Sequence, residues 1–413
     1  MAVRDDLAHL FRRAAFGASA AELDAAEQAG YEATVDRLLA LDSPDGPGDA
    51  IPAPVFPPLP SKDDARAAVQ WWLRRMAATA VPLREKIALF WHGHFATSIE
   101  KVKSAALMVA QNEVLRRQGA GDFGELTLAV AKDPAMLVWL DSNTNKVGHP
   151  NENFARELME LFTLGIGQYS ESDVREAARC FTGWTFDRRS GSFVFRPGQH
   201  DNGVKTVLGS TGNLAGEDVI RLATTHPASA RFVAAKVWSH FAYPVAVDDP
   251  VLDPLVAAYG SSLDVAALLR ATFLAPEFLS DAARNGLVKQ PVEYVVGAAR
   301  ALGVDAGGAE VVPVLNQLGQ VPFAPPSVGG WPQNGYWLST ATAAARARFA
   351  ARLVAAADLS AVASATPAAR VEAVARLLSV VWTPPTRDAL AAVAADPKAV
   401  VRLALVSPEY VVA

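Results

Sequence analysis

The residues best placed to do chemistry lie in one stretch of the chain, residues 149–184, HPNENFARELMELFTLGIGQYSESDVREAARCFTGW. Within it, Asn153, Glu157 and Glu160 are spaced i, i+4 and i+7, so they share one face of a predicted helix. The rest of that helix is broadly apolar, which predicts that it is largely buried. A buried carboxylate needs a polar cavity or partners from other segments. Glu157 is therefore the candidate general acid or base.

A second group of reactive side chains lies in the loop HDNGVKT, which contains His200, Asp201 and Lys205. A turn that only reverses the chain would need no more than Asp-Asn-Gly. We expect a flap that brings acid/base or anion-binding groups over the acidic helix, with a solvated hairpin turn as the alternative. Asp201 or Glu152 is then the second carboxylate, and His200 orients water or substrate. Paired carboxylates of this kind act in glycoside hydrolysis.

Six further residues are candidate substrate-binding groups. Amides, cations and an indole can bind the hydroxyls, anionic groups and flat faces of a polar substrate. Structural pairing is the alternative interpretation of Arg231, and Glu157 or Asp201 is a candidate partner for it. The six are Asn151, Asn153, Lys205, His226, Arg231 and Trp184.

The motif WHGHF places His92 and His94 close together and raises the possibility of a divalent metal ion as cofactor. The two imidazoles point the same way in extended backbone and about 200° apart in a helix, at roughly 100° per residue. Gly93 is compatible with either conformation, so the His-x-His pattern leaves the metal site open.

Helices must position these residues, because helical periodicity dominates the chain and predicts an all-α fold. The exception is residues 185–209, where SFVFR predicts a short β-hairpin or flap insertion. A Pro- and Gly-rich strap follows the first helices and ends in IPAPVFPPLP, 51–60. We expect one helical domain, 1–413, with sub-regions 1–60 (N-terminal helices and strap), 61–245 (site-bearing helices and flap) and 246–413 (C-terminal helices).

The individual helices are predicted from period, caps and breakers. They are Asp5–Phe16, Ala20–Leu41, Lys62–Thr79, Pro82–Phe95, Val102–Arg117, Phe123–Leu140, Pro150–Leu164, Ser172–Trp184, Glu217–Thr225, Ala228–Phe241, Asp249–Tyr259, Leu263–Phe273 and Pro291–Leu302, followed by alanine-rich helices. Two segments of the chain resemble each other weakly in sequence: ALLRATFLAPEFL, 267–279, and AVVRLALVSPEYV, 399–411.

Composition restricts the class of protein. The chain has 413 residues, 51% of them hydrophobic, a net charge of −5 and one cysteine, Cys180. Basic residues are scattered, which argues against a nucleic-acid partner, and a single cysteine excludes an intrachain disulfide. We find no segment apolar enough to span a membrane and no signal peptide, so we expect a soluble, cytoplasmic protein, or an exported one if a leader has been removed.

Seven motifs in order resemble one family. They are HLFRRAAFG, WHGHF, the stretch from NENFARELMELF to CFTGW, HDNGVKTVLG, HPASARFVAAKVW, APEFL and VGGWP. Together they identify the chain as similar to the bacterial domain of unknown function 1800 (DUF1800) family over nearly its whole length. The resemblance implies no catalytic residues. It implies that many relatives are exported, and that a partner from a neighbouring sulfatase-like family is possible.

Three hypotheses follow from the residues. The first is a hydrolase that acts on a glycan-like or other polar polymer or on a small molecule, with Glu157 as general acid/base. The second is a divalent-metal enzyme that uses His92 and His94 with carboxylates. The third is a non-catalytic binding or assembly module, in which the polar residues form a buried network.

Overall fold

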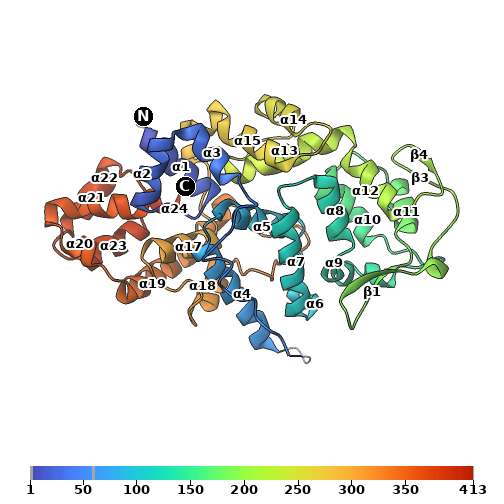
Figure 1. Cartoon of the computed structure of the whole chain (residues 1–413), viewed down its shortest axis with the longest axis horizontal. Coiled ribbons are helices and arrows are strands. Elements are labelled where there is room, and N and C mark those ends of the chain that lie inside the picture. Colours follow the sequence, from blue (N-terminus) through green and yellow to red (C-terminus); the bar gives the residue numbers. More distant parts are fainter. Residues whose placement is uncertain (1–2, 58–60, 413) are drawn as a thin grey trace.

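The structure of the protein is a computed structural model, and it describes residues 3–57 and 61–412. The described residues are mostly helical, with two small antiparallel hairpins (Figure 1), which confirms the all-α prediction with a β insertion. The last residues of the predicted proline-rich strap, 58–60, lie outside the described residues.

The N-terminal part of the chain is helical up to the acidic motif. Its helices are α1 (Val3–Ala14), α2 (Ala20–Ala29), α3 (Tyr31–Leu38), α4 (Lys62–Ala78), α5 (Pro82–His94), α6 (Ile99–Val102), α7 (Ala105–Gln118), α8 (Phe123–Ala131) and α9 (Pro134–Trp139), with a 3₁₀ turn η1 (Ser142–Thr144).

Three of the long helices that periodicity predicts are broken in the structure. The predicted helix 20–41 divides at Gly30, whose φ of +90° is unfavourable for other residues. The predicted helix 123–140 divides at Asp133, whose carboxylate accepts hydrogen bonds from the backbone N–H groups of Ala135 and Met136 and so caps α9. The predicted start at Val102 is wrong because Lys103, with φ +58°, separates α6 from α7. Local backbone geometry and capping override the apolar period at these points.

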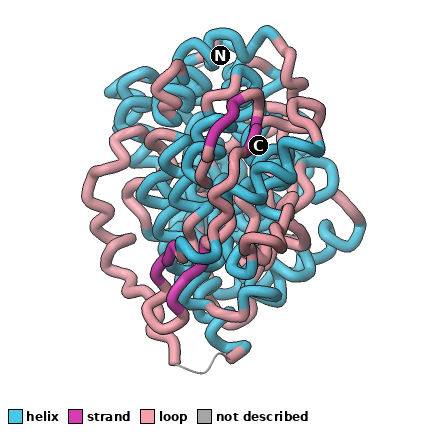
Figure 2. Tube along the Cα trace, turned by 90° about the vertical axis from the view of Figure 1, so that its right-hand side faces the viewer, coloured by secondary structure: helices cyan, strands magenta, loops and turns pink. Residues whose placement is uncertain are grey.

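The acidic motif forms α10 (Asn153–Glu157), a π-helical turn η2 (Leu158–Thr163) and α11 (Glu171–Cys180). Two hairpins follow instead of one flap, as Figure 2 shows in magenta. Strand β1 (Trp184–Asp187) pairs with β2 (Ser192–Phe195), and β3 (Lys205–Val207) pairs with β4 (Ser210–Gly212), so the insertion extends beyond the predicted end at 209.

Helices make up most of the remainder of the chain. They are α12 (Gly216–Thr224), α13 (Pro227–Phe241), α14 (Asp253–Tyr259), α15 (Val265–Leu274), α16 (Asp281–Asn285), α17 (Pro291–Ala301), α18 (Val311–Leu318), α19 (Thr340–Ala356), α20 (Ser360–Ala363), α21 (Pro367–Leu378), α22 (Pro384–Ala392), α23 (Pro397–Leu405) and α24 (Pro408–Val411). Short 3₁₀ turns are η3 (Pro197–Gln199), η4 (Pro250–Leu252), η5 (Pro276–Leu279) and η6 (Asn334–Trp337).

Buried apolar side chains form two clusters. Among the described residues, the first core contains α1–α3, α8 and α10–α16, and the second contains α4 and α17–α24. Helix α5 contributes to both, because Leu83, Ile87 and Phe90 lie in the first core while Ala88 and Leu89 lie in the second. Figure 1 shows the C-terminal helices at one end of the molecule and the hairpins at the other, with α1, α5 and α17 between them.

The two similar segments, 267–279 and 399–411, form similar local structures, one in each core. Helix α15 leads into η5 in the first core, and α23 leads into α24 in the second, each time at a proline that starts a new turn. Within the described residues, no helix has the length and apolar character needed to cross a membrane.

Candidate functional site

The acidic helix does not continue as a regular α-helix. After Glu157 it widens into the π turn η2, and the backbone N–H groups of Leu164 and Gly165 both donate to the carbonyl oxygen of Met159, at 3.0 Å each. Single π turns within helices often occur at functional sites. Periodicity could not predict this turn, because its side-chain pattern reads as helix.

Glu157 is half-buried at the end of α10, and its carboxylate forms no hydrogen bond or ion pair within the described part of the chain. Burial raises the pKa of its carboxyl group, and the negative charge of Glu160 raises it further, while Arg156 opposes the change. Glu160 accepts a hydrogen bond from the Tyr169 hydroxyl at 2.8 Å. Glu157 therefore has the raised pKa expected of a general acid.

The other two predicted carboxylates are held in ion pairs. Asp201 lies 2.8 Å from Nε of Arg179, and this hydrogen-bonded guanidinium lowers the pKa of Asp201 to about 2. Glu152 lies 3.2 Å from Arg156, which also binds Glu171. Each carboxylate thus already has a cationic partner.

The flap histidine packs on the end of α11. Nδ1 of His200 lies 2.9 Å from the carbonyl oxygen of Thr182, and the Thr182 hydroxyl accepts a hydrogen bond from the backbone N–H of Asp201. The structure therefore brings His200 and Asp201 together with Arg179. It shows no hydrogen bond from this group to Glu157 within residues 61–412.

Three other predicted binding residues have local structural partners. Asn151 donates its backbone N–H to the Asn145 side chain and accepts a hydrogen bond from the backbone N–H of Asn153, whose side chain is exposed. The Lys205 ammonium is buried and donates to Asn213 and to the carbonyl oxygen of Leu214, at 3.2 and 2.7 Å. In this structure Lys205 ties the second hairpin to the following loop.

The three remaining predicted binding residues, His226, Arg231 and Trp184, also contact structural partners near them in the fold. His226 caps α13 by accepting a hydrogen bond from the backbone N–H of Ala228. Arg231 pairs with Asp253 at 2.6 Å, and not with Glu157 or Asp201. Trp184 is buried in β1, where it packs edge-on against Phe193.

His92 and His94 both lie in α5, and their imidazoles contact different segments of the chain. Nε2 of His92 accepts a hydrogen bond from the backbone N–H of Phe323 at 2.8 Å, and Nε2 of His94 lies 2.9 Å from the carbonyl oxygen of Phe162 in the π turn. Burial lowers the pKa of each imidazole to about 3, so both are neutral. Among the residues that the structure describes, no three His, Cys, Asp or Glu side chains are grouped to hold a metal ion.

Several of the quoted motifs meet at a small pocket beside His94. Its lining includes Leu161 of the π turn, Lys236 and His240 of α13, and Trp331 of VGGWP. The backbones of two motifs touch here, since a Cβ added at Gly330 would lie 2.3 Å from the carbonyl oxygen of Gly93. The pocket, of about 90 Å³, is small for an organic ligand.

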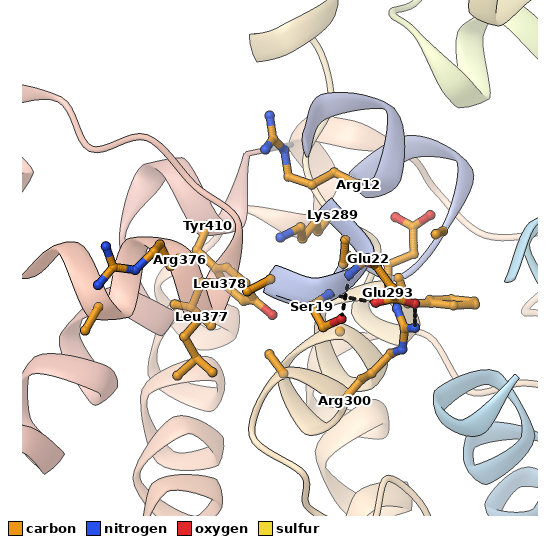
Figure 3. Close-up of a pocket in the computed structure, with 18 of the residues that line it drawn as sticks. Arg12, Ser19, Glu22, Lys289, Glu293, Arg300, Arg376, Leu377, Leu378 and Tyr410 are labelled. Carbon is orange, nitrogen blue, oxygen red and sulfur yellow. Dashed lines mark hydrogen bonds and ion pairs between the residues drawn. The ribbon is translucent and has the colours of Figure 1, made fainter. Parts of the chain in front are cut away.

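A larger cavity of about 580 Å³ lies beyond it, between the N-terminal helices and the C-terminal region (Figure 3). A narrow gap shares Ser239, His240 and Gln290 with the small pocket, and shares Arg12, Lys289 and Glu293 with the large cavity. The gap and the large cavity are rich in cations. Five charged residues line the gap, and we call them the cationic seam: Arg12, Arg13, Lys86, Lys289 and Glu293.

Four cations of the seam accompany one carboxylate. Glu293 binds Lys86 and accepts the backbone N–H of Gln290, and the guanidiniums of Arg12 and Arg13 donate to the carbonyl oxygens of Ser379 and Ala283. Burial lowers the pKa of Arg12 to about 10 and that of Arg13 to about 9, so both stay cationic at neutral pH.

Lys289 is the seam cation without an acceptor. The residue is 8% exposed and lines the large cavity, and its side chain forms no hydrogen bond or ion pair within residues 3–57 and 61–412. Its Nζ lies 3.6 Å from the centroid of the Tyr410 ring, and Figure 3 shows it between α1 and the segment that carries Tyr410. Burial lowers the pKa of Lys289 well below its ordinary value, and Arg12 lowers it further.

Reasoning from sequence missed the seam because it followed carboxylates and histidines. One signal was present: Arg13 lies three residues after Leu10 and Lys86 three after Leu83, so each cation falls on an apolar helical face. Arg12 and Arg13 belong to HLFRRAAFG, a motif used above only for the resemblance. Nothing local marks Lys289 as buried.

Comparison with known proteins supports the resemblance. The family model for DUF1800, described as a protein of unknown function, matches residues 9–412. Neither the curated proteins nor the solved structures contain a match to this chain. Because the family model covers almost the whole sequence, the chain belongs to the DUF1800 family.

Proposed function

We propose that the protein binds a small anion in the large cavity, with Lys289 as the group that pairs with it. The observation that carries the proposal is a buried lysine that lines a cavity and whose side chain has no acceptor within the described residues.

The energetics of the seam support an anionic ligand. A buried ion costs several kcal/mol unless a partner compensates it, and Glu293 already pairs with Lys86. The charges of Arg12, Lys86 and Arg13 disfavour a protonated Lys289, while the charge of Glu293 favours it. An anion in the cavity offsets this repulsion.

The test is anion binding by the wild type, by Lys289→Met and by a matched surface variant, Lys398→Met. Acetate, phosphate, sulfate and octanoate are each titrated by calorimetry and by thermal unfolding. We expect at least one anion to stabilise the wild type by about 2.7 kcal/mol at 100 times its Kd. Lys398 is exposed, so its variant should respond equally.

Lys289→Met should lose that response, while Lys289→Arg, which keeps the charge, should retain part of it. The proposal is wrong if no anion in the panel stabilises the wild type. It is equally wrong if Lys289→Met binds the anions as tightly as the wild type does.

The hydrolase hypothesis is a second candidate, favoured by the raised pKa of Glu157 next to the π turn. Asp201 and Glu152 are engaged in ion pairs, so the second carboxylate in this proposal is Glu160. Glu157 donates a proton to the leaving oxygen, and Glu160 accepts one from the attacking water.

Glu157→Gln tests this candidate, with Glu217→Gln as a surface control. 4-Nitrophenyl glycosides and dextran sulfate serve as substrates, and released 4-nitrophenol or reducing ends are measured. We expect the wild type and the control to turn over at least one substrate, and Glu157→Gln to lose at least 10²-fold in rate. Equal rates in Glu157→Gln and wild type would exclude the role of Glu157.

A further inference from the structure

We infer that the anion is amphipathic, a monocarboxylate whose head pairs with Lys289 and whose acyl chain lies along the wall of the large cavity. This inference rests on the proposed anion-binding function and specifies its ligand.

The wall of the cavity is mostly small and apolar. It combines the turn after α1 with one face each of α17, α20 and α21. These parts contribute Ala15, Ala18, Ala301, Val362, Leu377 and Leu378. A hydroxyl-rich ligand would find few hydrogen-bond partners here and would lose those it makes with water. An acyl chain has no such loss and gains from leaving water.

Most polar side chains of the cavity already have partners. Arg300 donates to Glu22 and to the carbonyl oxygen of Gly17, at 2.6 and 2.7 Å. Glu22 also accepts the backbone N–H of Ser19, at 2.7 Å, as part of the cap of α2. These groups are therefore not available to a ligand.

The charge on the ligand follows from what remains. Lys289 is the buried cation left without an acceptor in the described part of the chain, while the carboxylates of Glu22 and Glu293 line the same cavity. A single negative charge matches Lys289. A dianion would bring a second charge close to these carboxylates. Besides Lys289 and Arg300, the cations that line the cavity are Arg12, which donates to the carbonyl oxygen of Ser379, and Arg376, which is exposed.

The volume fits this class of ligand. About 580 Å³ lies within the range of about 300–1,000 Å³ that small-molecule sites occupy, and it accommodates an acyl chain of several carbons. Arg376, which is exposed, also lines the cavity, so the cavity opens to solvent near α21.

The experiment measures Kd by calorimetry on the full chain for acetate, butanoate, hexanoate and octanoate, with octan-1-ol and octyl phosphate as head-group controls. All are used below their micellar concentrations. We expect Kd to fall about fourfold for each added CH₂ until the cavity is filled. Octan-1-ol, which lacks the charge, should bind at least tenfold more weakly than octanoate.

Two variants separate head from chain. Lys289→Met should remove the difference between octanoate and octan-1-ol. Ala301→Leu, which adds volume to the wall, should shorten the chain length at which Kd stops falling. Acetate binding as tightly as octanoate, or octyl phosphate binding tighter than octanoate, would overturn this inference and leave anion binding intact. Binding of none of these ligands, nor of sulfate or phosphate, would overturn both.

Discussion

At the scale of single residues, the buried ionisable groups differ in whether the fold gives them partners. Glu85 is fully buried, and although burial raises its pKa, Arg116 and Arg75 outweigh that effect and keep the carboxyl pKa low. Lys289 has comparable burial without a carboxylate of its own. A paired buried charge is consistent with a structural role, and an unpaired one that lines a cavity is consistent with a binding role.

The first prediction concerns pH. Because the folded pKa of Lys289 is lowered, the unfolded chain binds the proton more tightly, so this residue makes stability rise with pH between its lowered pKa and about 10.5. Urea unfolding of ligand-free wild type between pH 7 and 10 should show this rise, and Lys289→Met should show less of it.

The comparison between variants isolates Lys289 from its neighbours, which are Arg12, Lys86, Glu293, His240 and Tyr410. Lys398→Met should follow the wild type. Parallel pH profiles for wild type and Lys289→Met would show that Lys289 has an ordinary pKa in the folded protein.

At the same scale, the sequence predicted a helix that carries Glu157, but not that its carboxylate has no hydrogen-bond or ion-pair partner within the described residues. Whether Asp201 and Glu152 are free depends on Arg179 and Arg156, and a sequence does not show which cation a carboxylate meets. The seam was harder still, because Arg12 and Lys289 are far apart along the chain and meet only through tertiary packing.

At the scale of elements, periodicity and capping predicted where helices form better than where they break. Ser19, Ser61 and Ser170 cap α2, α4 and α11 with side-chain hydrogen bonds, and all three starts lie close to the predicted ones. The breaks at Gly30 and Lys103 and the π turn depend on backbone conformation that an apolar period does not reveal.

Helix α5 gives the second prediction, because its close contact with VGGWP depends on a glycine. Gly330 has φ +79°, and a Cβ there would collide with the carbonyl oxygen of Gly93. Gly330→Ala should cost about 2–4 kcal/mol in free energy of unfolding, measured by chemical denaturation.

Gly335→Ala is its control, since a Cβ there meets nothing within 4 Å and the backbone φ is not positive. It should change stability by less than about 0.5 kcal/mol. Equal effects of the two substitutions would show that the two motif backbones are not in close contact.

At the scale of the whole molecule, the cavity is shared by the two hydrophobic cores. Helix α1 belongs to the first core, and α17, α21 and α24 belong to the second, while all four contribute to the cavity wall. A ligand there contacts both cores at once and should therefore stabilise them together.

Hydrogen exchange tests this coupling. Saturation with the tightest anion of the panel should slow exchange in α1 and in α17 and α21, with little change in the distant hairpins β1–β4. Lys289→Met should show no such protection at the same anion concentration. Protection confined to one core would place the anion outside the shared cavity.

The placement of Tyr410 has a consequence for how the protein is made. The backbone N–H of Lys289 donates to the carbonyl oxygen of Val411, and the ring of Tyr410 lies beside the ammonium that α1 also approaches. A chain emerging from the ribosome can form most of its helices. It cannot form the wall of the large cavity until residues near 410 have left the exit tunnel. Ligand capture is thus a late event in biosynthesis, and a nascent chain halted before Pro408 should be helical but unable to bind.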